Sequence, residues 1–123
     1  MLRFDHVFVF AKDAKRSSDF LAQILGIPPA LPSGPDGDIY RLEIEAAGAV
    51  QYHPHDGEIP THHIAFRVDR ATFDAALKRL QQMGIEYGND PEETKNLKYS
   101  DFLGGYGRIF FLDPDGHLFE IVA

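Results

Sequence analysis

Hydrophobic and polar residues follow one order along the first half of the chain and repeat it in the second. In residues 4–13, FDHVFVFAKD, apolar and polar residues alternate as in a β-strand that buries one face. In residues 13–28 apolar residues recur at helical spacing, and the expected helix ends at Gly26. Residues 61–69, THHIAFRVD, repeat the strand, and the following stretch repeats the helix and stops at Gly84. The apolar residues that share one face of each expected helix are Phe20, Leu21, Ile24 and Leu25 in the first and Phe73, Leu77, Leu80 and Met83 in the second. Each half therefore begins with a strand and a helix.

After each helix the pattern changes to short strands separated by turn residues, over 38–53 and over 105–123. The second of these stretches is bent by Asp-Pro-Asp-Gly at 113–116. Residues 88–106 are polar and rich in glycine, which favours a loop or lid. We predict an α+β protein of one domain, 1–123, with module one at about 1–57 and module two at about 58–123.

Composition narrows the possible functions. The chain of 123 residues has no cysteine, which excludes disulfides, thiolate metal sites and a cysteine nucleophile. Its net charge of -7 repels a phosphate backbone, so nucleic acid is not an expected partner. The N-terminal stretch has no apolar run long enough for a signal sequence or membrane span, so we expect a cytoplasmic protein with no membrane contact.

Strand parity assigns a role to one of the two adjacent histidines in THHIAFRV. Ile64, Phe66 and Val68 form the apolar set that a packed helix would cover, so His63 faces the other side of its strand. The same reasoning sends His6 away from the helices. It does the same for Glu120, which lies between Phe119 and Ile121. Two imidazoles and a carboxylate on one side of a sheet would suit Fe(II), and also Mn, Ni or Zn.

The stretches FDHVFVFAKD, THHIAFRV and IFFLDPDGHLFEIVA resemble the vicinal oxygen chelate superfamily, which includes glyoxalase I, fosfomycin-resistance transferases, extradiol dioxygenases and bleomycin-binding proteins. The resemblance covers nearly the whole chain. It implies two βαβββ modules that form an open, cup-shaped eight-stranded mixed sheet with helices on the outer face, and a homodimer. It also implies one divalent metal ion per site, bound by His6, His63 and Glu120. The fourth position would fall on Gln51, with His53 on the same strand face as the alternative.

Departures from the family patterns bear on the reaction. Glyoxalase I commonly has glutamate at the fourth position, and Gln51 cannot exchange protons as glutamate does. Glu120 then remains as the metal-bound catalytic base. Extradiol dioxygenases have a tyrosine where this chain has Phe110, so a proton donor would come from Tyr99 or Tyr106.

A substrate-binding surface follows from the same strand faces. Aromatic side chains on the metal side would contact an apolar part of a small substrate, and arginines there would contact an anionic part. The residues concerned are Phe8, Phe10, Phe110, Arg67 and Arg108. Two neighbours in sequence, Asp5 and His62, would point the other way, and His117 would be exposed in its turn.

We expect a metal-dependent enzyme acting on a small substrate that chelates the metal through neighbouring oxygens, either dioxygenase-like or similar to lactoylglutathione lyase. The alternative is a protein of the same fold that binds a small molecule or an antibiotic without turnover.

Overall fold

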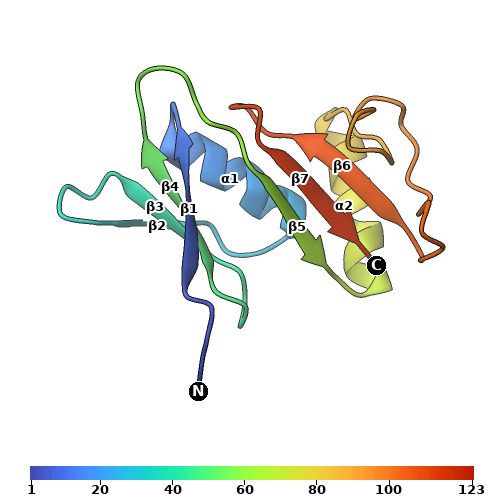
Figure 1. Ribbon diagram of the computed structural model, residues 1–123, viewed down its shortest axis with the longest axis horizontal. Helices are drawn as coiled ribbons and strands as arrows, with labels where there is room; N and C mark the ends of the chain where they lie inside the picture. The colour runs from blue at the N-terminus through green and yellow to red at the C-terminus, as the bar shows by residue number, and fades with distance from the viewer. The chain divides into compact units, whose positions relative to one another are not determined.

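The computed structural model describes residues 1–123, and these divide into two compact units, Met1–Thr61 and His62–Ala123. Each unit contains one α-helix and one β-sheet (Figure 1). The fold class is therefore α+β, as the sequence predicts, and the order of elements in the first unit largely recurs in the second. The division falls a few residues after the expected boundary between the modules.

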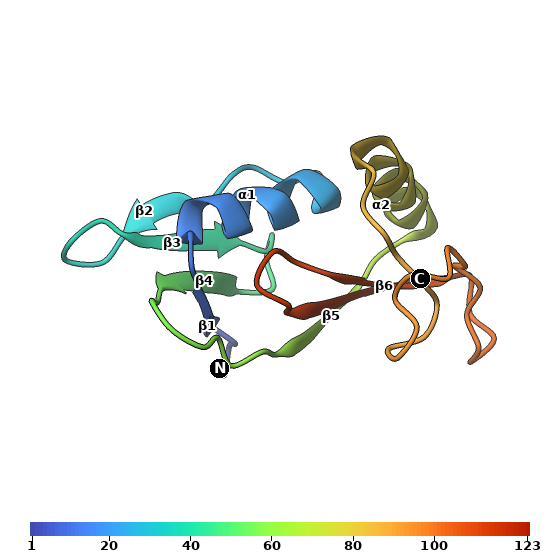
Figure 2. The ribbon, with the colours of Figure 1, turned by 90° about the horizontal axis from the view of Figure 1, so that it is seen from above.

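The first unit has a four-stranded mixed sheet covered on one face by a helix (Figure 2). Its strand order is β1-β4-β3-β2, with β1 parallel to β4 and the other pairs antiparallel. The elements are β1 (His6–Ala11), α1 (Ala14–Leu25), β2 (Leu31–Ser33), β3 (Ile39–Glu43) and β4 (Ala49–Pro54). Val9, Ala11, Val50 and Tyr52 are buried, so the alternate residues of β1 and β4 occupy the opposite face.

The second unit has a three-stranded sheet with the order β5-β7-β6, in which β5 is parallel to β7 and β6 is antiparallel to it. Its elements are β5 (His63–Arg67), α2 (Arg70–Met83), β6 (Arg108–Leu112) and β7 (Leu118–Val122). The fully buried side chains of this sheet are Ile109, Phe111, Phe119 and Ile121. They alternate with Arg108, Phe110 and Glu120, which lie on the other face.

Both helices end where the sequence predicts, and both begin with an aspartate cap. The side chains of Asp13 and Asp69 accept hydrogen bonds from backbone N–H groups of the first turns of α1 and α2. Gly26 and Gly84 end the helices with φ of 69° and 68°, a left-handed conformation that glycine adopts without a Cβ penalty. Neither helix combines the length and apolar character needed to cross a bilayer.

The eight-stranded sheet implied by the resemblance is not what the structure contains. It has seven strands in separate sheets of four and three. In the second unit, Gly88 pairs with the free edge of β6 through two backbone hydrogen bonds with Phe110, and Tyr99 accepts one from Arg108. The rest of 88–107 lacks the alternating apolar residues of a strand and forms turns and irregular segments instead.

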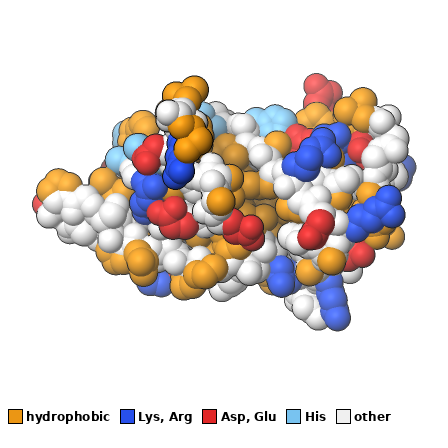
Figure 3. Space-filling view, turned by 90° about the horizontal axis from the view of Figure 1, so that it is seen from below, with side chains coloured by type: hydrophobic (Ala, Val, Ile, Leu, Met, Phe, Trp, Pro, Cys, Tyr) orange, Lys and Arg blue, Asp and Glu red, His pale blue; other side chains and the backbone are white.

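Charged side chains do not gather into a basic stripe on the face shown in Figure 3. Lys and Arg are scattered there among acidic and apolar side chains.

Candidate metal centre

A histidine and a glutamate meet on the sheet of the second unit. His63 begins β5, Glu120 lies in the middle of β7, and the parallel register aligns Ala65 with Glu120. The Nε2 atom of His63 lies 2.8 Å from Oε1 of Glu120. The imidazole is 48% exposed and the glutamate side chain only 9%. Strand parity therefore brings these two predicted ligands into direct contact within one unit.

A largely buried arginine, Arg108, holds the other oxygen of Glu120. The Nη1 of Arg108 donates to Oε2 of Glu120, and its Nε donates to Oδ1 of Asp101 at 2.8 Å. The arginine and aspartate side chains are 12% and 4% exposed. The hydrogen bond from Arg108 is the main reason why the pKa of Asp101 lies below its usual value, so Asp101 stays charged at neutral pH. Glu120 thus has one oxygen bound to a cation and one facing His63.

The first unit contains a similar chain of contacts at His6. Its Nδ1 lies 2.5 Å from Oδ2 of Asp5, and Arg41 contacts the same oxygen at 3.5 Å while its Nε donates to Glu43. The hydrogen bond with His6, followed by the positive charge of Arg41, lowers the pKa of Asp5. With Nδ1 engaged by a carboxylate, Nε2 of His6 is the nitrogen that a metal would use.

The two candidates for the fourth position lie on the same face of β4. Nε2 of His53 is 3.4 Å from Oε1 of Gln51, and β1 pairs in register with β4 so that Phe8 is opposite Gln51. The ring of Phe8 contacts that of His53 at 4.4 Å and that of Phe10 at 5.0 Å. Phe8, Phe10 and His53 therefore form an aromatic cluster in the first unit, and His53 lies in β4.

The predicted substrate-binding residues of the second unit are not all brought to the His63–Glu120 pair. Phe110 is, because it lies opposite Glu120 on β6 and its ring is 6.1 Å from that of His63. Arg67 is exposed at the end of β5, on the strand face of His63. Arg108 reaches Glu120, but its guanidinium is occupied by two carboxylates rather than open to an anionic substrate.

The two tyrosines lie in the segment between α2 and β6. Tyr99 is exposed, and its carbonyl oxygen accepts the backbone N–H of Arg108. Tyr106 donates its hydroxyl to Asp74 of α2 at 2.9 Å, and its ring contacts Phe73. The structure therefore places Tyr106 against the helix.

The prediction that His117 is exposed is wrong. Its side chain is fully buried, and its Nδ1 accepts the backbone N–H of His62 at 3.1 Å. Its own backbone N–H donates to Oδ1 of Asp113, which also accepts from Asp115. The turn residues suggested exposure, but the imidazole is folded back to join the start of β7 to the start of β5.

The donor atoms of His63 and Glu120 in the second unit fit part of a metal site. Two ligands at about 2.1 Å from an ion and at a right angle to each other lie about 3 Å apart, which is close to the 2.8 Å between Nε2 of His63 and Oε1 of Glu120. A neutral imidazole and a carboxylate are suitable ligands for Fe, Mn, Ni or Zn. No cluster of three histidine or acidic side chains forms in the structure. The second unit therefore offers a two-ligand half-site, and the first offers the single imidazole of His6.

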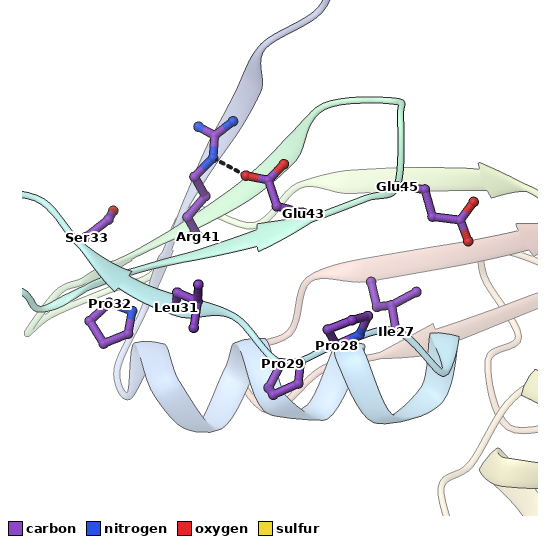
Figure 4. Close-up of a pocket in the computed structure, with 9 residues that line it drawn as sticks. All are labelled: Ile27, Pro28, Pro29, Leu31, Pro32, Ser33, Arg41, Glu43 and Glu45. Carbon is purple, nitrogen blue, oxygen red and sulfur yellow. Dashed lines mark hydrogen bonds and ion pairs between the residues drawn. The ribbon is translucent and has the colours of Figure 1, made fainter.

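A hollow of about 530 Å³ lies in the first unit, at the edge formed by β2, β3 and the segment that follows α1 (Figure 4). Pro28, Pro29 and Leu31 form its apolar side, and Arg41 and Glu43 form an ion pair at its rim. It contains none of the predicted metal ligands or aromatic residues.

The amino-acid sequence matches a known protein family. Residues 3–121 match the profile of the Glyoxalase/Bleomycin resistance protein/Dioxygenase superfamily. The chain belongs to this superfamily. Among curated relatives, "Fosfomycin resistance protein FosX" of Listeria innocua is 28% identical over 126 residues, which cover 96% of this chain and 86% of that protein. A mouse "Run domain Beclin-1-interacting and cysteine-rich domain-containing protein" is 32% identical over 91 residues, but this chain covers only 9% of its length.

Solved structures of the superfamily are also similar. Oxidase ChaP-H2 has a TM-score of 0.90 at 32% identity, covering 99% of this chain and 93% of that one, and oxidase ChaP-H1 has a TM-score of 0.90 at 28% identity, covering 100% and 96%. A FosX variant from Listeria monocytogenes in complex with Mn(II) and 1S,2S-dihydroxypropylphosphonic acid has a TM-score of 0.72 at 22% identity, covering 100% and 92%. That last likeness concerns the fold.

Sequence reasoning missed the residues behind the ligands. Nothing in the spacing of Asp101 and Arg108 indicates that they meet at Glu120, because Asp101 lies in an irregular loop without periodicity. Asp5 was expected to point away from His6, yet its carboxylate reaches the imidazole of its neighbour. The signal in the sequence for the contact of Asp5 with His6 was that an acidic residue directly precedes a candidate ligand.

Proposed function

We propose that this protein is a metal-dependent oxidative enzyme that acts on a small aromatic substrate with two neighbouring oxygens. The contact between His63 and Glu120 carries this proposal, because it presents a nitrogen and an oxygen at the separation of adjacent metal ligands. The fold match and 32% identity to an oxidase support oxidation over the other reactions of the superfamily.

The metal would be bound by His6, His63 and Glu120, with Gln51, His53 or water completing the sphere. When bound, a divalent ion (Fe, Mn, Ni or Zn) would supply a Lewis acid that the two substrate oxygens chelate and that polarises them. His6 belongs to the first unit, and His63 and Glu120 belong to the second. We propose in addition that the protein is a homodimer, as the resemblance to the superfamily implies.

The surrounding side chains select the substrate. Phe8, which is exposed, and Phe10 in the first unit provide an aromatic surface for a planar apolar ring, whereas Phe110 in the second unit is buried beside His63. Arg67 is the exposed cation on the strand face of His63 and would contact an anionic group. Tyr99 is the phenol that remains available as a proton donor, because the hydroxyl of Tyr106 is bound to Asp74.

The lyase alternative needs proton exchange at two substrate carbons. Gln51 has no titratable proton, so Glu120 alone would have to serve both carbons, and one of its oxygens is bound to Arg108. The geometry therefore favours oxidation over an isomerase or lyase reaction. A protein that only binds its ligand would keep the aromatic surface without needing the histidine–glutamate contact.

Metal content and turnover test the proposal. The purified protein is analysed for bound metals, and its Fe(II)-loaded and Mn(II)-loaded forms are tested for oxygen consumption with a panel of catechols and related aromatic diols. Isomerisation of a hemithioacetal and loss of fosfomycin are measured in parallel. We expect metal-dependent oxygen consumption with at least one diol. Turnover of the hemithioacetal or of fosfomycin alone would refute the oxidative assignment, and tight ligand binding without any turnover would support the binding protein instead.

A further inference from the structure

Asp101 lies at the centre of an anchored loop. Its Oδ1 accepts from Arg108 Nε and from the backbone N–H of Leu103, and its Oδ2 accepts from the backbone N–H of Gly105. A Cβ added to Gly105 would lie 2.3 Å from Oδ2, so the chain has room for this carboxylate only because residue 105 is glycine. The loop is therefore built closely around the Asp101 carboxylate.

The arginine that Asp101 holds is fixed on several sides. Its Nε is bound to Asp101 and its Nη1 to Glu120, and the ring of Phe102 covers its guanidinium carbon at 5.5 Å. An arginine constrained in this way has one orientation available, which in turn fixes the rotamer of Glu120. Oε1 is the oxygen that this arrangement leaves pointing at His63.

Charge balance adds a second consequence. Glu120 and Asp101 each contribute one negative charge to this buried group, and Arg108 contributes one positive charge. If Asp101 were neutral, Arg108 would cancel the charge of Glu120, and a metal cation would meet a ligand with little net attraction. With Asp101 charged, one net negative charge remains beside His63.

We propose that Asp101 is a positioning residue for the metal centre, which acts through Arg108 to orient Glu120 and to leave it one metal-binding oxygen, Oε1. This inference rests on the proposed function, since it concerns the same ligands. It adds Asp101, which is distant in sequence from the ligand motifs and controls metal affinity without contacting the metal.

A purely structural ion network would affect stability alone, so the test separates stability from metal affinity. The probe is Mn(II), titrated into the full-length protein while free Mn(II) is followed by electron paramagnetic resonance. Thermal unfolding without metal is measured on the same samples. The variants are Asp101→Asn, which removes the charge but keeps one acceptor oxygen, and Asp101→Ala, which removes both.

The matched control is Asn89→Ala. The side chain of Asn89 donates to the backbone and side chain of Ser100 and accepts from Asn96, so it anchors the same loop without contacting Arg108 or Asp101. We expect Asp101→Asn to weaken Mn(II) binding about 10-fold and Asp101→Ala up to about 100-fold, the range for outer partners of metal ligands. Asn89→Ala should change the affinity by less than about 2-fold, the margin allowed for a residue with no contact to the site.

Arg108→Lys provides a second arm if Asp101→Ala fails to fold. Lysine keeps the charge but cannot contact two carboxylates in a fixed plane, so it should also weaken Mn(II) binding. Unchanged affinity in Asp101→Asn, or an equal loss in Asn89→Ala, would overturn the role of Asp101. A wild-type protein that binds no Mn(II), Fe(II) or Zn(II) would instead overturn the proposed function, and the role of Asp101 with it.

Discussion

The turn before β7 gives the sharpest stability prediction. Asp113 is buried, and its Oδ1 accepts the backbone N–H groups of Asp115 and His117 at 2.9 Å each. Replacing it with alanine would leave both donors without this acceptor. A hydrogen bond to a charged group contributes about 1.5–3 kcal/mol. Because the two bonds share one atom and do not add fully, we expect Asp113→Ala to lower the free energy of unfolding by about 2–4 kcal/mol.

Asparagine at the same position should behave differently. Burial raises the pKa of Asp113 above 3.8, and its Oδ2 has no hydrogen-bond partner. A carboxyl whose folded-state pKa is raised binds its proton more tightly in the folded state, so stability falls as pH rises from the unfolded pKa through the folded pKa. Asp113→Asn keeps one acceptor oxygen and has no charge to bury. Its stability relative to wild type should therefore be higher at pH 7 than at pH 3.

Urea unfolding followed by circular dichroism at both pH values measures these differences. Wild-type stability in Asp113→Ala would refute the reasoning about the turn. A relative stability of Asp113→Asn that does not change with pH would show that the carboxylate is not penalised by burial.

Three further predictions concern packing and the metal centre. Gly107→Ala would place a Cβ 2.3 Å from Cζ of the buried Phe73, so we expect a loss of about 1–3 kcal/mol in urea unfolding, and an unchanged midpoint would contradict the tight contact. Asp5→Asn removes the carboxylate that holds Nδ1 of His6 and should weaken Mn(II) binding about 10- to 100-fold in a metal titration, whereas unaltered binding would show that Asp5 does not orient the ligand. Adding Mn(II) at a hundred times its Kd should stabilise the protein by about 2.7 kcal/mol in thermal unfolding, reversed by a chelator, and no shift would argue against binding to the folded state.

Much of the fold follows from local pattern. Strand alternation correctly separated the buried Phe119 and Ile121 from Glu120, because the period of two leaves no other choice once one face is buried. The helix ends followed from Gly26 and Gly84, whose positive φ the sequence signals directly. The expected eighth strand came from the family resemblance, and it is missing because the stretch after Gly88 has no strand pattern.

The parts of the site in which residues distant along the chain contact each other could not be predicted from the sequence. Arg108 lies on the predicted face, but whether it meets a substrate or a carboxylate depends on where Asp101 is placed by an irregular loop. His117 is buried for a similar reason, since its imidazole bonds to the backbone of His62, 55 residues away. Such contacts depend on tertiary packing, which no local periodicity encodes.

Metal titration of three histidine variants tests the central claim most directly. His6→Ala and His63→Ala each remove a proposed ligand, and His62→Ala removes the adjacent histidine, whose ring stacks on His117. We predict that wild type and His62→Ala bind Mn(II) with similar affinity. The affinity of the other two variants should fall by at least about 100-fold, because losing a ligand costs at least as much as losing a side chain that supports a ligand. Retention of wild-type affinity in His63→Ala would contradict the account.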